Sequence, residues 1–234
     1  MFFDTIFGRN FGRIYISKAI LVCHGFPYEA GSVLNKGYGD LAKFFSIIAP
    51  TMVFDFSGCG NSRGFFSVKY WVEDLKGIAE KFEKVSLIGY SMGGLIAIRA
   101  SAELENLEKI IAVSTPIPDI FSEERLALMF ENANRIMRIR SFEDFRKEME
   151  SVYEMDPRKY IKKIKAPKLI VHGTRDEIVP FDCGEAIYQN AEEPKAFLKV
   201  VNGDHFLRRN FKVMGIVADW ISGRIKDKEF EIIL

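Results

Sequence analysis

Short apolar runs alternate with longer amphipathic stretches along most of this 234-residue chain. The runs are rich in Val and Ile and are apolar throughout, not only at every second position. This pattern is typical of strands in a parallel sheet that is covered on both faces. It predicts strands at residues 19–23, 52–56, 85–89, 109–113, 168–172 and 197–201.

The stretches between these runs have apolar residues at helical spacing. They predict helices at residues 39–47, 68–82, 92–104, 182–190 and 211–225. Alternating strands and helices build right-handed βαβ units, so we expect an α/β fold with a doubly wound, mostly parallel sheet. Residues 2–17 could add an antiparallel hairpin around residues 8–12. The tail KDKEFEIIL could pair with a sheet edge or a neighbouring chain, or simply pack.

Residues 115–166 interrupt the alternation. They carry no strand pattern, and this segment is too long for a structureless connection. Apolar positions near a 3.6-residue period, and Ser141 with Asp144 as a weak capping box, predict two or three helices. Because such insertions commonly cover a site, we expect a lid on a single domain whose core is residues 1–114 and 167–234. A helical layer without a binding role is the alternative.

Composition narrows the class of protein. Hydrophobic residues make up 48% and charged residues 28%, and the net charge is +1, a balance typical of globular proteins without the basic excess of nucleic-acid binders. No apolar run approaches the ~18 residues of a membrane span, and the N-terminus lacks a signal-peptide pattern. The three cysteines lie far apart, which argues against a disulfide framework and favours a reducing, cytoplasmic location.

The motif GYSMGG at residues 89–94 follows a predicted strand and precedes a predicted helix. In that setting G-x-S-x-G is typical of a nucleophile elbow, where Ser91 sits on a sharp turn. Side chains at Gly89 and Gly93 would collide as the chain doubles back. The turn would place the Met92 N–H at the positive end of the helix, where an oxyanion is stabilised. The alternative is a glycine-rich helix start packed against the sheet.

A serine hydroxyl needs an adjacent base to become a nucleophile. The chain has three histidines. His205 lies in a loop after the last predicted strand, from which it could reach over the carboxyl edge of the sheet. His172 ends a strand and fits a partly buried structural role. His24 fits a role in supporting its loop by hydrogen bonding.

The base in turn needs an acid that holds its tautomer. Asp176, in the loop after residues 168–172, is the candidate. Glu177 is one residue out of phase, and Asp182 starts a predicted helix, where capping is its natural role. Asp204 would have difficulty bonding the neighbouring His205 ring while directing it at the serine.

Two further loops carry glycines. In HGFP, Pro27 has no N–H, so the Phe26 N–H is the natural second oxyanion donor; a plain turn is the alternative. DFSGCGNSRG at residues 55–64 lacks the Lys-Ser/Thr ending of a P-loop and predicts a tight turn in which Cys59 could be exposed. The basic run at residues 158–168 predicts a solvated helix face.

In this order along the chain, HGFP, DFSGCGNS, GYSMGG, HGTRDEIVP and GDHF resemble the α/β-hydrolase superfamily. The resemblance covers about residues 19–220 and is closest to small esterases, lipases and serine-peptidase-like enzymes with a helical lid. It implies that Ser91, Asp176 and His205 form a catalytic triad. It also implies that the backbone N–H groups of Phe26 and Met92 form an oxyanion hole.

We therefore expect a carboxylesterase-like serine hydrolase that cleaves acyl bonds of a small or medium, partly apolar substrate through an acyl-enzyme. No metal or organic cofactor is implied, the expected partner is a small-molecule acyl substrate, and a homodimer is left open. HGF-type loops also accompany thioesterases, carbon–carbon hydrolases and perhydrolases. A peptidase, a thioesterase, a carbon–carbon hydrolase or a non-catalytic binding protein of this fold is the alternative. A serine at position 91 argues against haloalkane dehalogenases and epoxide hydrolases, which use an aspartate.

Overall fold

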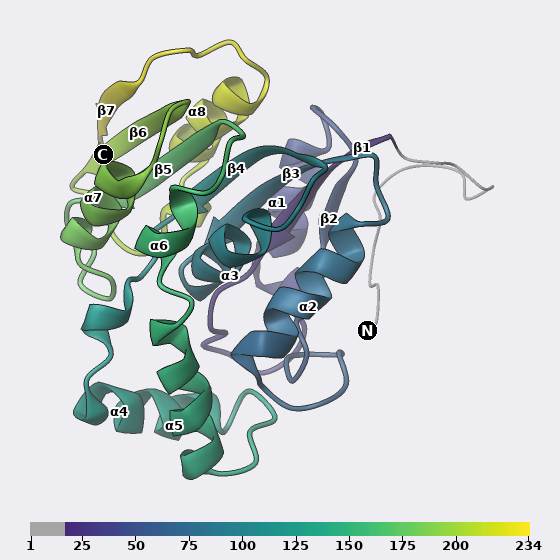
Figure 1. The fold of residues 1–234 in the computed structure, drawn as a ribbon, viewed down its shortest axis with the longest axis vertical. Helices are drawn as coiled ribbons and strands as arrows, with labels where there is room; N and C mark the ends of the chain where they lie inside the picture. Colours follow the sequence, from purple (N-terminus) through teal and green to yellow (C-terminus); the bar gives the residue numbers. More distant parts are fainter. Residues whose placement is uncertain (1–16) are drawn as a thin grey trace.

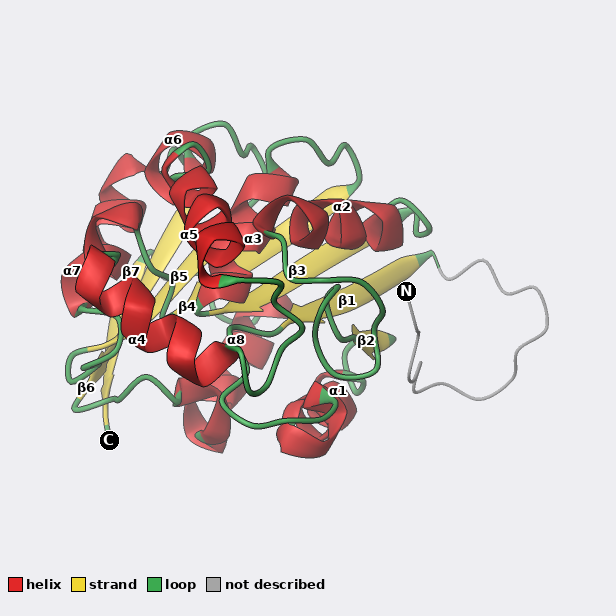
Figure 2. Cartoon of the chain, turned by 90° about the horizontal axis from the view of Figure 1, so that it is seen from below, coloured by secondary structure: helices red, strands yellow, loops and turns green. Residues whose placement is uncertain are grey.

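The computed structural model describes residues 17–234. In this part of the chain, one sheet has the strand order β2-β1-β3-β4-β5-β6-β7, and every neighbouring pair is parallel. Helices lie on both faces of the sheet (Figures 1 and 2). This confirms the predicted doubly wound α/β fold. The hairpin expected at residues 2–17 lies almost wholly outside the described residues.

The predicted strands are all present. The strands are β1 Lys18–Cys23, β2 Thr51–Val53, β3 Lys84–Tyr90, β4 Leu107–Val113, β5 Lys168–Gly173, β6 Lys195–Val201 and β7 Glu229–Ile233. β2 is shorter than predicted because the chain leaves the sheet after Val53, and the Phe56 N–H donates to a side chain, His24 Nε2, instead. β7, which the sequence left open, pairs with β6 at the sheet edge.

The predicted helices are also present; four of them end two to four residues early, and the helix predicted at residues 182–190 ends at Asn190 as predicted. The helices of the core are α1 Tyr38–Phe45, α2 Val68–Ala79, α3 Met92–Ser101, α7 Phe181–Asn190 and α8 Phe211–Ile221. The Ser67 hydroxyl caps α2 by accepting from the Tyr70 N–H at 3.3 Å. None of the described helices is long and apolar enough to span a bilayer.

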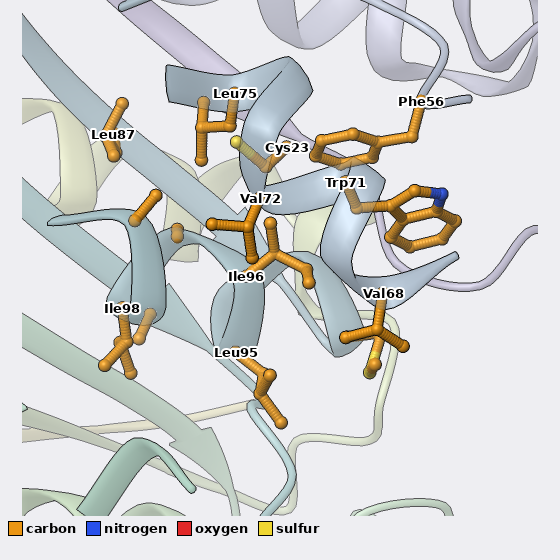
Figure 3. Packing of buried hydrophobic residues seen from close by; sticks show 14 of the residues in the cluster. Cys23, Phe56, Val68, Trp71, Val72, Leu75, Leu87, Leu95, Ile96 and Ile98 are labelled. Carbon is orange, nitrogen blue, oxygen red and sulfur yellow. The ribbon is translucent and has the colours of Figure 1, made fainter. Parts of the chain in front are cut away.

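Alternate residues of each central strand enter different cores, because successive side chains point to opposite faces. In β1, Leu21 packs with α2 and α3, whereas Ile20 and Val22 pack with α1 and α8. Figure 3 shows the core on the side of α2 and α3. There the Trp71 and Phe56 rings stack with centroids 4.7 Å apart. The continuous apolar runs of the sequence therefore have a direct cause in burial on both faces.

The segment between β4 and β5 holds three α-helices, α4 Glu123–Ala133, α5 Phe142–Glu150 and α6 Pro157–Ile161. This matches the expected helical insertion. The guanidinium of Arg158 donates to both carboxylate oxygens of Asp119, at 2.7 and 2.8 Å, and so ties the end of the segment to its start. Figure 1 shows α4 and α5 beyond one end of the sheet.

Candidate active site

Ser91 stands directly between β3 and α3 in a strained backbone conformation, with φ 52° and ψ −126°. Its N–H donates to the Val113 carbonyl at 2.8 Å, which fixes the turn to the neighbouring strand. A Cβ on Gly89 would lie 2.5 Å from the Gly93 carbonyl oxygen, and a Cβ on Gly93 would lie 2.3 Å from the His24 carbonyl oxygen. The close approaches expected of an elbow are therefore present.

The structure brings His205 and Asp176 together from two different loops. His205 Nδ1 lies 2.8 Å from Asp176 Oδ2 and 3.1 Å from Oδ1. The His205 side chain is 12% exposed, and the Asp176 side chain is fully buried. Because a carboxylate only accepts, Nδ1 carries the proton and Nε2 keeps its lone pair.

The loop of Asp176 folds back on the carboxylate. Oδ1 accepts the N–H groups of Ile178 at 3.0 Å and Val179 at 2.7 Å. Burial alone would raise the pKa of Asp176, but the nearby imidazoles of His172 and His205 and the Val179 N–H outweigh it and hold the pKa well below its usual range. Asp176 therefore stays ionised across the range in which histidine titrates.

His172 is completely buried, whereas the sequence indicated only partial burial. Its Nε2 donates to the Val179 carbonyl at 2.9 Å and lies 3.5 Å from Asp176 Oδ2. Its role is structural as expected, but its contact with Asp176 was missed. The spacing of four residues between His172 and Asp176 was the available signal, and it is visible only once the loop is known to fold back.

His24 supports the loop after β1, as expected. Phe56 N–H donates to Nε2 at 3.1 Å, so Nδ1 carries the proton and donates to the Gly25 carbonyl at 2.6 Å. Complete burial lowers the pKa of His24 to about 4, although the Gly25 carbonyl and Asp55 oppose this shift. The ring is therefore neutral at pH 7 and serves as a fixed support.

The same loop packs against the serine. A Cβ on Gly25 would lie 2.8 Å from the Ser91 Cβ. The next N–H along the chain, that of Phe26, has no hydrogen-bond partner within residues 17–234. The Met92 N–H is the first of α3, and such groups lack an intrahelical partner. Both predicted oxyanion donors are thus available to a ligand.

A cavity of about 350 Å³ opens beside these residues. Ser91, His205, Phe26 and Met92 line it. The helical segment between β4 and β5 also lines it, mostly with apolar side chains; they are Pro116, Ile120, Phe121, Met129, Ala133 and Ile136. The arrangement places a hydroxyl, an imidazole and free N–H donors around a largely apolar space, as acyl transfer requires.

The chain matches the model of the alpha/beta hydrolase family over residues 20–209. It belongs to that family. Among curated proteins, it is 22% identical to the AB hydrolase superfamily protein YisY of Bacillus subtilis, with 92% of this chain and 95% of that protein covered. It is 24% identical to the uncharacterized protein R595 of Acanthamoeba polyphaga mimivirus, with coverage of 86% and 70%.

Several solved hydrolase structures share the fold of this chain. The enol-lactonase of Burkholderia xenovorans LB400 has a TM-score of 0.69 at 16% identity, covering 93% of this chain and 95% of that one. The monoacylglycerol lipase of Paleococcus ferrophilus has a TM-score of 0.66 at 20% identity, with coverage of 88% and 95%. A meta-cleavage product hydrolase of Pseudomonas fluorescens has a TM-score of 0.63 at 16% identity, with coverage of 89% and 92%.

Lys159, Lys162, Lys163 and Lys165 of the basic run are exposed as predicted, but two other surface residues are more buried than the sequence indicated. Cys59 is fully buried, not exposed, because the turn at residues 55–64 folds inward, and burial raises the pKa of its thiol well above the usual range. Lys168, the last residue of the basic run, is also buried. Its Nζ donates to the Glu192 and Pro194 carbonyls at 2.7 and 3.3 Å.

The other acids have different positions. Asp204 Oδ1 accepts the Phe206 N–H at 2.8 Å, and Glu177 is exposed. Asp182 lies in the first turn of α7 but does not cap it as expected, because the N-cap is Pro180 and no side chain accepts a capping hydrogen bond there. Within residues 17–234, no group of three or more His, Cys, Asp or Glu side chains is arranged to hold a metal ion.

Proposed function

We propose that this hydrolase is a carboxylesterase-like serine hydrolase in which Ser91 is the nucleophile, His205 the base and Asp176 the orienting acid. One observation carries the proposal. Ser91 on its strained turn and His205, held through Nδ1 by a buried carboxylate, line the same cavity. Because Nδ1 is committed to Asp176, Nε2 is the nitrogen that takes the serine proton.

The reaction follows from these positions. Ser91 Oγ attacks the substrate carbonyl while His205 accepts the hydroxyl proton. The resulting oxyanion binds to the N–H groups of Phe26 and Met92, each worth about 3–4 kcal/mol in the transition state. His205 then protonates the leaving group. Water, activated by the same imidazole, hydrolyses the acyl-enzyme and restores the serine.

The cavity favours a small or medium acyl substrate. Its volume of about 350 Å³ is near the lower end of ligand pockets, which span roughly 300–1,000 Å³. The helices of residues 115–166 supply most of the apolar lining, and in this proposal they act as a lid over the bound acyl group. Burial of that group supplies the binding energy.

A direct test compares p-nitrophenyl ester hydrolysis by the wild type, Ser91→Ala and Ser222→Ala. Ser222 is an exposed serine at the end of α8 and serves as the matched control. We expect Ser91→Ala to lose at least about 10³-fold in kcat and Ser222→Ala to retain the wild-type rate. Equal rates for Ser91→Ala and the wild type would refute the proposal. Thioester and peptide panels on the same preparations then rank the bond types.

A further inference from the structure

Arg208 lies three residues after His205, in a 3-10 turn at Leu207–Arg209, and only 7% of it is exposed. Its contacts are all with neutral groups. Nη1 donates to the Lys36 carbonyl at 3.3 Å, Nη2 donates to the Tyr28 hydroxyl, and the guanidinium lies 4.6 Å from the centroid of the Tyr38 ring. Within residues 17–234, no carboxylate lies within 4 Å of it.

A buried guanidinium without a counter-ion is an uncommon arrangement. Removing a charge from water is costly, and buried arginines are normally paired with a carboxylate or a phosphate. A carbonyl, a hydroxyl and a ring face recover only part of that cost. An anionic ligand at this position would supply the missing counter-ion.

Arg208 lies beside the reaction centre, because it lines a second, smaller cavity together with Tyr38, Gly25, Ser91 and His205. Gly25 connects the Arg208 side of this cavity to the serine. The Gly25 N–H donates to the Tyr38 hydroxyl at 3.4 Å, and Gly25 itself packs against the Ser91 Cβ. Among residues 17–234, no Asp or Glu lines this cavity. Its volume is about 40 Å³, more than the ~10–15 Å³ that one water needs.

We propose that Arg208 binds a carboxylate of the substrate in this small cavity. The substrate class is then an ester that carries a carboxylate close to the scissile carbonyl, with its apolar remainder in the larger cavity. The planar guanidinium suits a carboxylate because it can form two parallel hydrogen bonds with it. This inference rests on the proposed esterase function and names the substrate for the same site.

The test uses two shape-matched ester pairs, because the substrate carboxylate can lie on the acyl side or the alcohol side of the scissile ester bond. On the acyl side, p-nitrophenyl hydrogen succinate is compared with p-nitrophenyl 4-methylpentanoate. On the alcohol side, O-acetylglycolate is compared with isobutyl acetate. In each pair an isopropyl group replaces the carboxylate. We expect the wild type to prefer the charged ester by about 10-fold or more in kcat/KM in one of the pairs.

Arg208→Gln should lower that charged-to-neutral ratio by about 10- to 100-fold while hydrolysis of the neutral ester persists. Arg175→Gln is the matched control, because Arg175 carries the same charge, is exposed and lines neither cavity. Its ratio should stay within about 3-fold of the wild type. A wild type that prefers the neutral ester in both pairs, or an unchanged ratio in Arg208→Gln, would overturn the inference.

A binding measurement separates this inference from the proposed function. Succinate and glycolate, tested at constant ionic strength, should raise the Tm of Ser91→Ala but not that of Ser91→Ala/Arg208→Gln. Stabilisation without any ester hydrolysis would support the anion site and contradict the esterase function. Serine-dependent hydrolysis without charge preference or stabilisation would overturn the anion site alone. If Arg208→Gln fails to fold, the wild-type ratios and ligand stabilisation of Ser91→Ala decide.

Discussion

His205 Nδ1 lies 2.8 Å from Oδ2 of Asp176, a carboxylate with no exposed side-chain surface. This contact fixes which ring nitrogen carries the proton and which is free to accept one. The two residues are 29 positions apart in the chain, and they meet because the loops after β5 and β6 leave the same edge of a parallel sheet.

Replacing the acid should disable the base without removing it. We expect Asp176→Asn to lower kcat by about 10³- to 10⁴-fold, because the amide no longer holds Nδ1–H or stabilises the imidazolium. Asp204→Asn is the control, since Asp204 is exposed and only accepts the Phe206 N–H. Steady-state kinetics on short p-nitrophenyl esters measure both. A larger loss in Asp204→Asn than in Asp176→Asn would show that the acid is misassigned.

The sequence indicated most of this site because each motif has a local cause. The glycines around Ser91 are required by a turn that can be recognised without tertiary contacts, and His205 was found among only three histidines. The contact between His172 and Asp176 was missed because it depends on how residues 177–179 fold back. Arg208 was missed because nothing in the sequence distinguishes it from the exposed Arg209 beside it.

The strands of the fold were predictable where they carry a local signal, and β7 was not. Six strands are buried on both faces, so their apolar runs stand out in the sequence. β7 lies at the sheet edge, and its residues alternate between exposed and half-buried, with two glutamates among them. Its pairing with β6 is therefore set by tertiary context, which a local pattern does not reveal.

The buried His24 should make the protein acid-sensitive. Its pKa in the folded state is about 4, below the ordinary value of about 6.5, so the unfolded chain binds a proton that the folded chain excludes. The contribution of His24 to the unfolding free energy is complete above pH ~6.5 and is lost as the pH falls toward 4. Between pH 7 and pH 4.5, the wild type should lose roughly 2–2.5 kcal/mol more unfolding free energy than His24→Gln. Urea denaturation at pH 7 and pH 4.5 measures this; parallel losses in both proteins would contradict it.

The contact between Gly25 and the serine predicts a steric effect on catalysis. In Gly25→Ala the new Cβ would lie 2.8 Å from the Ser91 Cβ and 2.9 Å from the Tyr90 carbonyl oxygen, so the loop must shift. We expect at least about a 10-fold loss in kcat/KM, because misplacing the Phe26 N–H weakens oxyanion binding.

Gly77→Ala is the control for this substitution. Gly77 lies within α2, and a Cβ there meets no atom within 4 Å. The substitution should raise the unfolding free energy by about 0.5–1 kcal/mol and leave activity unchanged. Full activity in Gly25→Ala would show that the loop of Gly25 and Phe26 has no role in the reaction.

The lining of the larger cavity predicts control of substrate length from α4. Ala133 is buried and lines the cavity, whereas Ala127 is exposed on the same helix. Ala133→Phe should shift the preferred p-nitrophenyl acyl chain to shorter lengths, because the ring occupies the apolar space. Ala127→Phe should keep the wild-type profile. Identical profiles for all three proteins would show that the 115–166 segment is a helical layer with no part in binding.

The most direct measurement is the site of covalent labelling by a fluorophosphonate probe, read by intact mass and peptide mapping. We expect one adduct per chain, located on Ser91, absent from folded Ser91→Ala and formed far more slowly in His205→Ala. An unlabelled wild type that is demonstrably folded, or an adduct on any other residue, would contradict it.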